Sequence, residues 1–233
     1  PDTALVVVNL VSNVTGVSND VPAIGALLSR RGIPLLVDGA QGVGHIPVDV
    51  AAWGVDMLAC PAHKGLHGLS GGFLLTNRSL APLLYGGTGT ASQSLRQPLG
   101  VDGWEAGTQD YAGICALGKG VEWTYAHLDR LIAQEDGLID YLLDELSSIE
   151  RVKVYGHGHG ILSFALEGAP STWVADQLDE RDIAVRAGLH CAPLMHRYLG
   201  TTREGLVRVS VGWDTTTRDI DRLLAALTSL ARQ

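Results

Sequence analysis

Short apolar runs alternate with stretches of helical periodicity in the first half of the chain. Four such runs predict strands, the first of them buried, at residues 5–11, 33–37, 57–60 and 72–75. Residues 21–31 have the spacing of a helix, which Gly32 is expected to end. Strands separated by helices are typical of an α/β protein with a mostly parallel or mixed sheet.

The pattern changes in the second half. A broad apolar stripe predicts a helix over residues 110–127, continuing over 128–149; its members are Ile114, Leu117, Val121, Trp123 and Tyr125. Further strands are predicted at 152–155, 161–166 and 206–211, and helices at 171–180 and 216–232. Thr216 and Asp219 form a capping signal for the last helix. We expect one domain over residues 1–125 and a smaller α/β domain over 126–233.

Composition excludes several classes of protein. The chain has 233 residues, of which 46% are hydrophobic and 18% charged, and no apolar run approaches the ~18 residues of a membrane span. A net charge of −8 does not favour nucleic acid or anionic lipid. Three cysteines make no disulfide framework, which fits a reducing, cytoplasmic location. The chain opens at Pro1, shortly before an apolar run, which is the pattern of a start within a domain. We expect either that a segment has been removed or that the chain is a fragment of a longer protein.

Two of the candidate chemical groups follow predicted strands. Asp38 ends an apolar strand, where α/β sheets build ligand sites, although a turn-capping aspartate has the same pattern. Lys64 is one of only three lysines and lies between His63 and Gly65 just after another strand. A lysine in such a pocket can form an imine with an aldehyde, whereas an ordinary loop lysine is solvated.

Cys191 is the third candidate. It follows His190 and precedes a predicted helix at residues 192–199, so helix N–H groups and an imidazolium are expected to stabilise its thiolate. A free cysteine is more often a small buried hydrophobe. We adopt that interpretation for Cys60, in a strand, and Cys115, in a helix, but not for Cys191, whose neighbours are polar and glycine-rich.

Five motifs carry a family resemblance. In order they are Ser12-Asn13-Val14-Thr15-Gly16, Val37-Asp38-Gly39-Ala40-Gln41, His63-Lys64, Glu105-Ala106-Gly107-Thr108, and Arg186-x-Gly188-x-x-Cys191-Ala192. Their order and spacing resemble the class V aminotransferase family, in particular its cysteine desulfurase and selenocysteine lyase branch. The resemblance implies the type I fold of pyridoxal 5′-phosphate (PLP) dependent transferases, with a partial large domain of mostly parallel sheet and a small C-terminal α/β domain.

The resemblance also implies roles for the residues that would hold the cofactor. Lys64 would hold PLP as a Schiff base and move the substrate's α-proton. Asp38 would pair with the pyridinium nitrogen, and Gln41 would bind the ring's phenolic oxygen. His63 would help to hold the phosphate, and Thr108 would reach the phosphate of the neighbouring subunit in a homodimer.

A second set of roles concerns the substrate, which the resemblance identifies as cysteine or selenocysteine. Asn13 and Arg208 would bind its carboxylate, and Arg186 would lie near the substrate. Cys191 would take the sulfur as a persulfide and leave alanine, with a possible acceptor protein for the sulfur. No metal, nucleic acid or membrane is implied.

The sequence departs from the family in three places, one of which is Trp213-Asp214-Thr215, where the family often has Tyr-Asn-Thr after the carboxylate-binding arginine. Pro61 stands where the family has Ser or Thr, so one phosphate contact is lost or supplied differently. The family's first half, with its phosphate loop and ring-stacking aromatic residue, has no counterpart before Ala4, so the resemblance covers the C-terminal portion alone. Two alternatives to a desulfurase therefore stay open: a class V aminotransferase with another substrate, in which Cys191 has no use, and a fragment that is catalytically incomplete.

Overall fold

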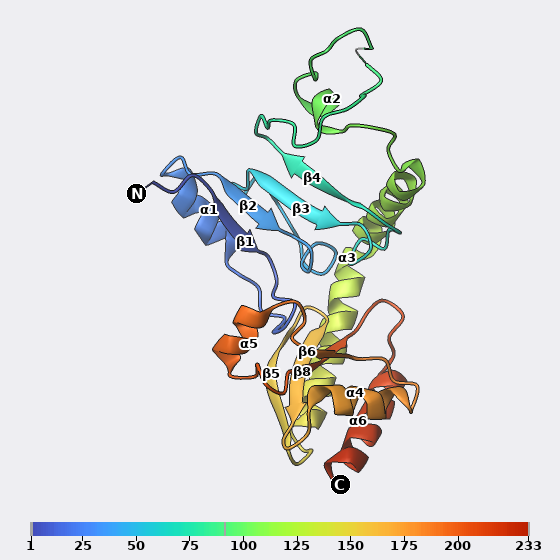
Figure 1. Cartoon of the computed structure of the whole chain (residues 1–233). Coiled ribbons are helices and arrows are strands. Elements are labelled where there is room, and N and C mark those ends of the chain that lie inside the picture. The colour runs from blue at the N-terminus through green and yellow to red at the C-terminus, as the bar shows by residue number, and fades with distance from the viewer. Residues whose placement is uncertain (1, 91, 233) are drawn as a thin grey trace. The chain divides into compact units, whose positions relative to one another are not determined.

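The computed structural model describes residues 2–90 and 92–232, which divide into two compact units (Figure 1). The first unit comprises Pro1–Val8, Asp20–Val43 and Val48–Ala126. The second comprises Asn9–Asn19, Gly44–Pro47 and His127–Gln233. Two early segments of the sequence therefore belong to the later unit. The expected division into one domain over residues 1–125 and a smaller domain over 126–233 stays a prediction.

The first unit is built on a four-stranded sheet with the order β1-β2-β3-β4. Its strands are β1 (Val6–Asn9), β2 (Leu35–Asp38), β3 (Met57–Pro61) and β4 (Gly72–Thr76). β2 and β3 are parallel, whereas β3 and β4 are antiparallel, so the sheet is mixed. Helix α1 (Val21–Ser29) lies beside β2 (Figure 1), and the Asp20 carboxylate caps it by accepting a hydrogen bond from the backbone N–H of Ala23.

The expectation of a buried strand over residues 5–11 is wrong in part. β1 is shorter, and the side chain of Val7 is 61% exposed. β1 is the outer strand of the described sheet, so its side chains have a neighbouring strand on one side only. Leu10 and Val11 are buried, but they lie beyond the strand and belong to the second unit.

Helix α3 (Tyr111–Leu146) is a single helix of 36 residues that begins in the first unit and ends in the second. The apolar stripe predicted for its first half is not its buried face, because four of the members are exposed: Ile114, Val121, Trp123 and Tyr125. The buried positions are small instead, namely Gly113, Gly120 and Thr124. A Cβ atom on Gly120 would overlap the carbonyl group of Leu66, so glycine is required where α3 approaches the loop after β3.

The second unit contains a four-stranded antiparallel sheet with the order β5-β6-β8-β7. Its elements are β5 (Val152–Gly158), β6 (Ile161–Leu166), α4 (Ser171–Asp179), β7 (Arg186–Gly188), α5 (Pro193–Leu199), β8 (Leu206–Ser210) and α6 (Thr217–Ala231). One hydrophobic core joins the end of α3, β6, β8, α4 and α6, and it includes the fully buried Phe164. The predicted cap of α6 is confirmed, since the Thr216 backbone N–H donates to Asp219 Oδ2 at 2.9 Å.

Residues 9–19 fold as a tight loop of the second unit. Val11 and Ser18 form an isolated β-bridge, and the Ser163 hydroxyl on β6 donates to the carbonyl oxygen of Val14 at 2.5 Å. A Cβ atom on Gly16 would overlap the backbone of Gly158 on β5, which explains the glycine at this position. Within residues 2–90 and 92–232, no helix combines the length and the apolar character needed to cross a membrane.

Candidate active site

Asp38 and Lys64 lie at the same edge of the first sheet. Asp38 is the last residue of β2, and its Cα pairs with that of Ala59 on the parallel strand β3. Lys64 follows the end of β3 by three residues. The Asp38 side chain is oriented by the backbone N–H of Ala40, which donates to Oδ1 at 2.9 Å. Both side chains are exposed, so a ligand has access to them.

The charges of Asp38 and Lys64 both affect the pKa of the buried Cys60 thiol. Burial raises the pKa of Cys60 to about 11; the Asp38 carboxylate adds to the rise, and the Lys64 ammonium opposes it. Both charged groups therefore lie within electrostatic range of the same thiol. Cys60 stays protonated at neutral pH, which confirms its interpretation as a buried structural cysteine.

The loop that carries Lys64 is held by hydrogen bonds and by glycine packing. The backbone N–H of His67 donates to the carbonyl oxygen of Lys64 at 2.9 Å, and that of Gly68 donates to Ala62 at 2.8 Å. The Thr124 hydroxyl of α3 donates to Gly65 at 3.3 Å. This support from α3 was not predicted from the sequence, in which the seven-residue spacing of Gly113 and Gly120 within a helix was the available signal.

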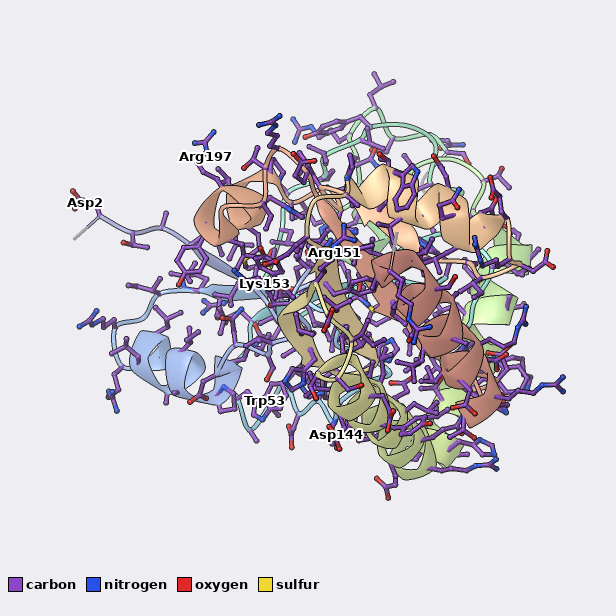
Figure 2. The ribbon with its side chains drawn as sticks, turned by 90° about the horizontal axis from the view of Figure 1, so that it is seen from below. Asp2, Trp53, Asp144, Arg151, Lys153 and Arg197 are labelled. Atoms are coloured by element: carbon purple, nitrogen blue, oxygen red, sulfur yellow. The ribbon has the colours of Figure 1, made fainter. Side chains whose placement is uncertain are left out.

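The other two lysines are engaged elsewhere. Lys119 on α3 forms an ion pair with Glu122 at 2.7 Å, which raises the pKa of Lys119. Lys153 lies on β5 of the second unit (Figure 2), with its Nζ 5.1 Å from the ring centroid of Tyr155. Of the three lysines, Lys64 is the one that follows a strand of the first sheet at the edge where β2 ends with Asp38.

The donor set around Lys64 fits PLP on its ring side. It offers a primary amine for the aldehyde, the Asp38 carboxylate for the pyridine N–H, and the accessible side chains of Gln41 and His63 in the same unit. Fewer hydrogen-bond donors are available for the phosphate, because Pro61 ends β3 and offers neither a hydroxyl nor an N–H group. Thr108 lies in the loop between α2 (Val101–Trp104), an element too short to predict, and α3.

A second cluster, in the second unit, surrounds Cys191. Arg186 on β7 and Arg208 on β8 are directly paired positions of antiparallel strands, so their side chains share one face of the sheet. Nη2 of Arg186 lies 3.4 Å from Sγ of Cys191, and the thiol is exposed. β7 has only three residues and was not predicted, yet it provides the arginine that contacts the thiol.

Arg208 lies deeper than Arg186. Its Nη1 donates to the backbone carbonyl of Asn13 at 2.9 Å, whereas its buried Nε has no hydrogen-bond partner among the residues that the structure describes. Burial and the nearby Arg186 charge lower the pKa of Arg208, while Cys191 opposes the shift. In the described ranges no carboxylate forms an ion pair with either arginine. Two adjacent guanidinium groups without an acidic partner are suited to bind an anion.

Asn13 connects the early loop to the cysteine loop. Its Nδ2 donates to the backbone carbonyl of His190 at 2.6 Å, and its own carbonyl accepts from Arg208. The structure thus brings together the four sequence-predicted residues Asn13, Arg186, Cys191 and Arg208 in the second unit, while Asp38, Gln41, His63, Lys64 and Thr108 belong to the first.

The expectation that a His190 imidazolium stabilises the thiolate is wrong. His190 is 2% exposed, and burial lowers its pKa to about 4 against a weaker opposing effect of its hydrogen bond to the Arg186 carbonyl. The ring is therefore neutral at pH 7, so Arg186 is the cation beside the thiol. Helix α5 begins at Pro193, one residue later than predicted.

Cys115 also differs from expectation. Its side chain on α3 is exposed rather than packed, because the helix buries its glycine face instead. Among residues 2–90 and 92–232, no cluster of three His, Cys, Asp or Glu side chains is arranged to hold a metal ion.

Comparison with known proteins extends this picture. The family profile described as Aminotransferase class-V matches residues 1–223. A cysteine desulfurase of Klebsiella pneumoniae subsp. pneumoniae is 37% identical over 240 residues, covering 97% of this chain and 58% of that protein. A cysteine desulfurase of Salmonella agona is 34% identical, covering 99% and 59%. The chain thus spans somewhat more than half the length of these relatives.

Solved structures give the same result. The apo structure of a cysteine desulfurase from Thermococcus onnurineus NA1 superposes with a TM-score of 0.91 at 31% identity, covering 98% of this chain and 60% of that one. A cysteine desulfurase from Escherichia coli, with an S-sulfonic acid, superposes with a TM-score of 0.86 at 28% identity, covering 98% and 59%.

Proposed function

Because this chain belongs to the class V aminotransferase family, we propose that it carries the cofactor lysine and the sulfur-accepting cysteine of a PLP-dependent cysteine desulfurase. Its fold is the corresponding part of the PLP type I fold of cysteine desulfurases. The observation that carries the proposal is the exposed Cys191 thiol at 3.4 Å from Arg186 and beside Arg208. Transamination needs no such thiol.

We propose that the first-unit cluster binds PLP. When bound, PLP accepts electrons from the substrate's α-carbon. Asp38 would keep the pyridine nitrogen protonated, which the orientation of its carboxylate by Ala40 favours. The Lys64 amine would hold the cofactor covalently and would move the α-proton. Gln41 and His63 would hold the ring oxygen and the phosphate, and Thr108 would reach the phosphate of the neighbouring subunit.

We propose that the second-unit cluster binds and desulfurates the substrate. Arg208 and Asn13 hold the substrate carboxylate, with Arg186 adding positive charge to the same face of the sheet. The Cys191 thiolate attacks the substrate sulfur: the new S–S bond forms as the substrate's Cβ–S bond breaks. The enzyme keeps a persulfide, and the carbon skeleton leaves as alanine after protonation. Selenocysteine fits the same step, since selenium differs little from sulfur in size.

The test uses the intact protein. PLP is added, the visible spectrum is scanned for a protein-bound cofactor, and cysteine is then added while sulfide, protein persulfide and alanine are measured. Cofactor binding followed by stoichiometric alanine and sulfur is the expected result. Cofactor binding with keto-acid formation and no sulfur release would identify an aminotransferase instead. No cofactor binding at all would identify a catalytically incomplete chain.

We also propose a two-fold homodimer. Large apolar side chains of the first unit are exposed, among them Leu83, Leu95 and Leu99, and a partner subunit would remove such side chains from water. Light scattering at micromolar concentration is expected to give twice the monomer mass, and a cross-linker placed at Thr108 is expected to reach the partner's Lys64 before its own. A strictly monomeric protein contradicts this prediction.

The sulfur acceptor is proposed to be a second protein that docks near the exposed Cys191, because a persulfide must leave the enzyme before the next turnover. The cytoplasmic location expected from the cysteine content stays a prediction.

A further inference from the structure

A chain of buried side chains begins at the residue next to Cys191. His190 and His196 are 2% and 0% exposed, and Nδ1 of His190 lies 3.3 Å from Nε2 of His196. Beyond them, Nε2 of His190 lies 3.2 Å from the Arg186 carbonyl oxygen, and Nδ1 of His196 lies 2.9 Å from Oγ1 of Thr201. These four residues form one continuous series of hydrogen bonds inside the second unit.

The direction of the series follows from its ends. A backbone carbonyl only accepts, so His190 carries its proton on Nε2 and its Nδ1 accepts from Nε2–H of His196. Nδ1 of His196 then accepts the hydroxyl proton of Thr201. Both rings are neutral in this arrangement, and burial, which lowers the pKa of both, favours that form.

The series ends at a turn with an unusual backbone. His190 and Cys191 have φ angles of 52° and 60°, two consecutive non-glycine residues in the left-handed region. Such a pair persists only where the surroundings hold it. Here the ring of His190 is held by its hydrogen bond to His196, and the backbone carbonyl of His190 accepts a hydrogen bond from the Asn13 side chain. The His190 ring also binds the backbone carbonyl of Arg186. His190 therefore connects the backbone of Arg186 to the residue before Cys191, and the side chains of Arg186 and Cys191 are in contact.

We propose that the buried His190–His196–Thr201 series is a positioning device that holds the Cys191 thiol against the Arg186 guanidinium. The charged groups that face the thiol are Arg186 from β7 and Arg208 from β8, and the neutral His190 ring adds no charge. Loosening the series therefore moves the thiol away from its cations. The use of that thiol in sulfur transfer rests on the proposed function; its placement does not.

The test measures alkylation of Cys191 by iodoacetamide in the intact protein, without substrate. Rates are read by peptide mass spectrometry from about pH 6 to about pH 10, a range that brackets the ordinary thiol. Thr201→Val removes the terminal hydroxyl with little change in shape, and Thr201→Ser restores it. His196→Leu removes the centre of the series. The exposed Cys115 on α3 is the internal control, and its rate is expected to stay constant in every variant.

We expect Thr201→Val to slow Cys191 alkylation at neutral pH about threefold and His196→Leu about tenfold, because the thiol loses its fixed position beside the Arg186 guanidinium. Thr201→Ser is expected to restore the wild-type profile. If the profile of Thr201→Val coincides with that of the wild type at a temperature where both are folded, the series is packing only and the proposal is wrong. Should His196→Leu not fold, the Thr201 pair decides the question.

The two proposals fail separately. A protein that releases no sulfur from cysteine, but whose Cys191 profile depends on the Thr201 hydroxyl, refutes the desulfurase and keeps the positioning series. A protein that releases sulfur from cysteine, but whose Cys191 alkylation profile does not depend on the Thr201 hydroxyl, supports the desulfurase and refutes the positioning series.

Discussion

Replacing Lys64 with alanine is expected to abolish the visible absorbance of the protein-bound cofactor and to lower turnover by at least about a hundredfold. The reason is that one side chain supplies both the covalent link and the proton transfer, and the latter alone contributes ~10²–10⁴ to a rate. The measurement is a spectrum after PLP addition, followed by a cysteine assay.

Lys119→Ala and Lys153→Ala are matched controls for this variant. The ammonium group of Lys119 pairs with Glu122 and that of Lys153 lies over the Tyr155 ring, so the spectrum and turnover are expected to stay at wild-type values. Borohydride trapping followed by peptide mapping gives an independent reading. A trapped cofactor on Lys119 or Lys153 would contradict the assignment.

The second large effect is expected at Cys191. Cys191→Ser should keep the cofactor spectrum, because no cofactor contact is assigned to this residue, and should lose persulfide formation and desulfurase activity entirely. A serine hydroxyl beside Arg186 is not ionised at neutral pH and does not accept sulfur. Some activity on selenocysteine is expected to remain, since selenium leaves more readily without attack by a thiol. Turnover of cysteine at the wild-type rate would exclude the proposed sulfur step.

Substitutions of the other two cysteines distinguish an effect on sulfur transfer from an effect on the stability of the fold. Cys115→Ser is expected to change neither, because this side chain is exposed on α3. Cys60→Ser places a hydroxyl in a buried site and is expected to lower the free energy of unfolding by about 1–3 kcal/mol while sulfur transfer persists. A denaturant titration beside the activity assay distinguishes the two effects.

Periodicity was sufficient to predict the long or strongly apolar elements. β2, β3, β6 and α6 lie within a few residues of their predicted bounds, because their side chains are buried in a pattern that the sequence displays directly. β7 and α2 were missed, since three or four residues are too few to show a period. The buried face of α3 was assigned to its apolar stripe because glycine packing against a backbone leaves no hydrophobic signal.

The candidate site was predictable in its residues but not in its electrostatics. Strand ends and spacing indicated Asp38, Lys64 and Cys191. The protonation of His190 was not predictable, because it depends on burial and on partners six residues away along a loop and a short helix. Arg186 was placed near the cysteine by resemblance, and its contact with the thiol required the pairing of β7 with β8.

The contacts of the loop at residues 9–19 also affect the order in which parts of the protein fold. It is synthesised before its partners, because Asn13 binds His190 across 177 residues and Arg208 across 195. Contacts of such separation form late and slowly. The contacts that anchor the cysteine loop are therefore expected to form late in folding. A polypeptide beginning at residue 127 would contain Cys191 but neither the Asn13 amide nor its carbonyl, so separate expression of that half is expected to yield a thiol without its anchored surroundings.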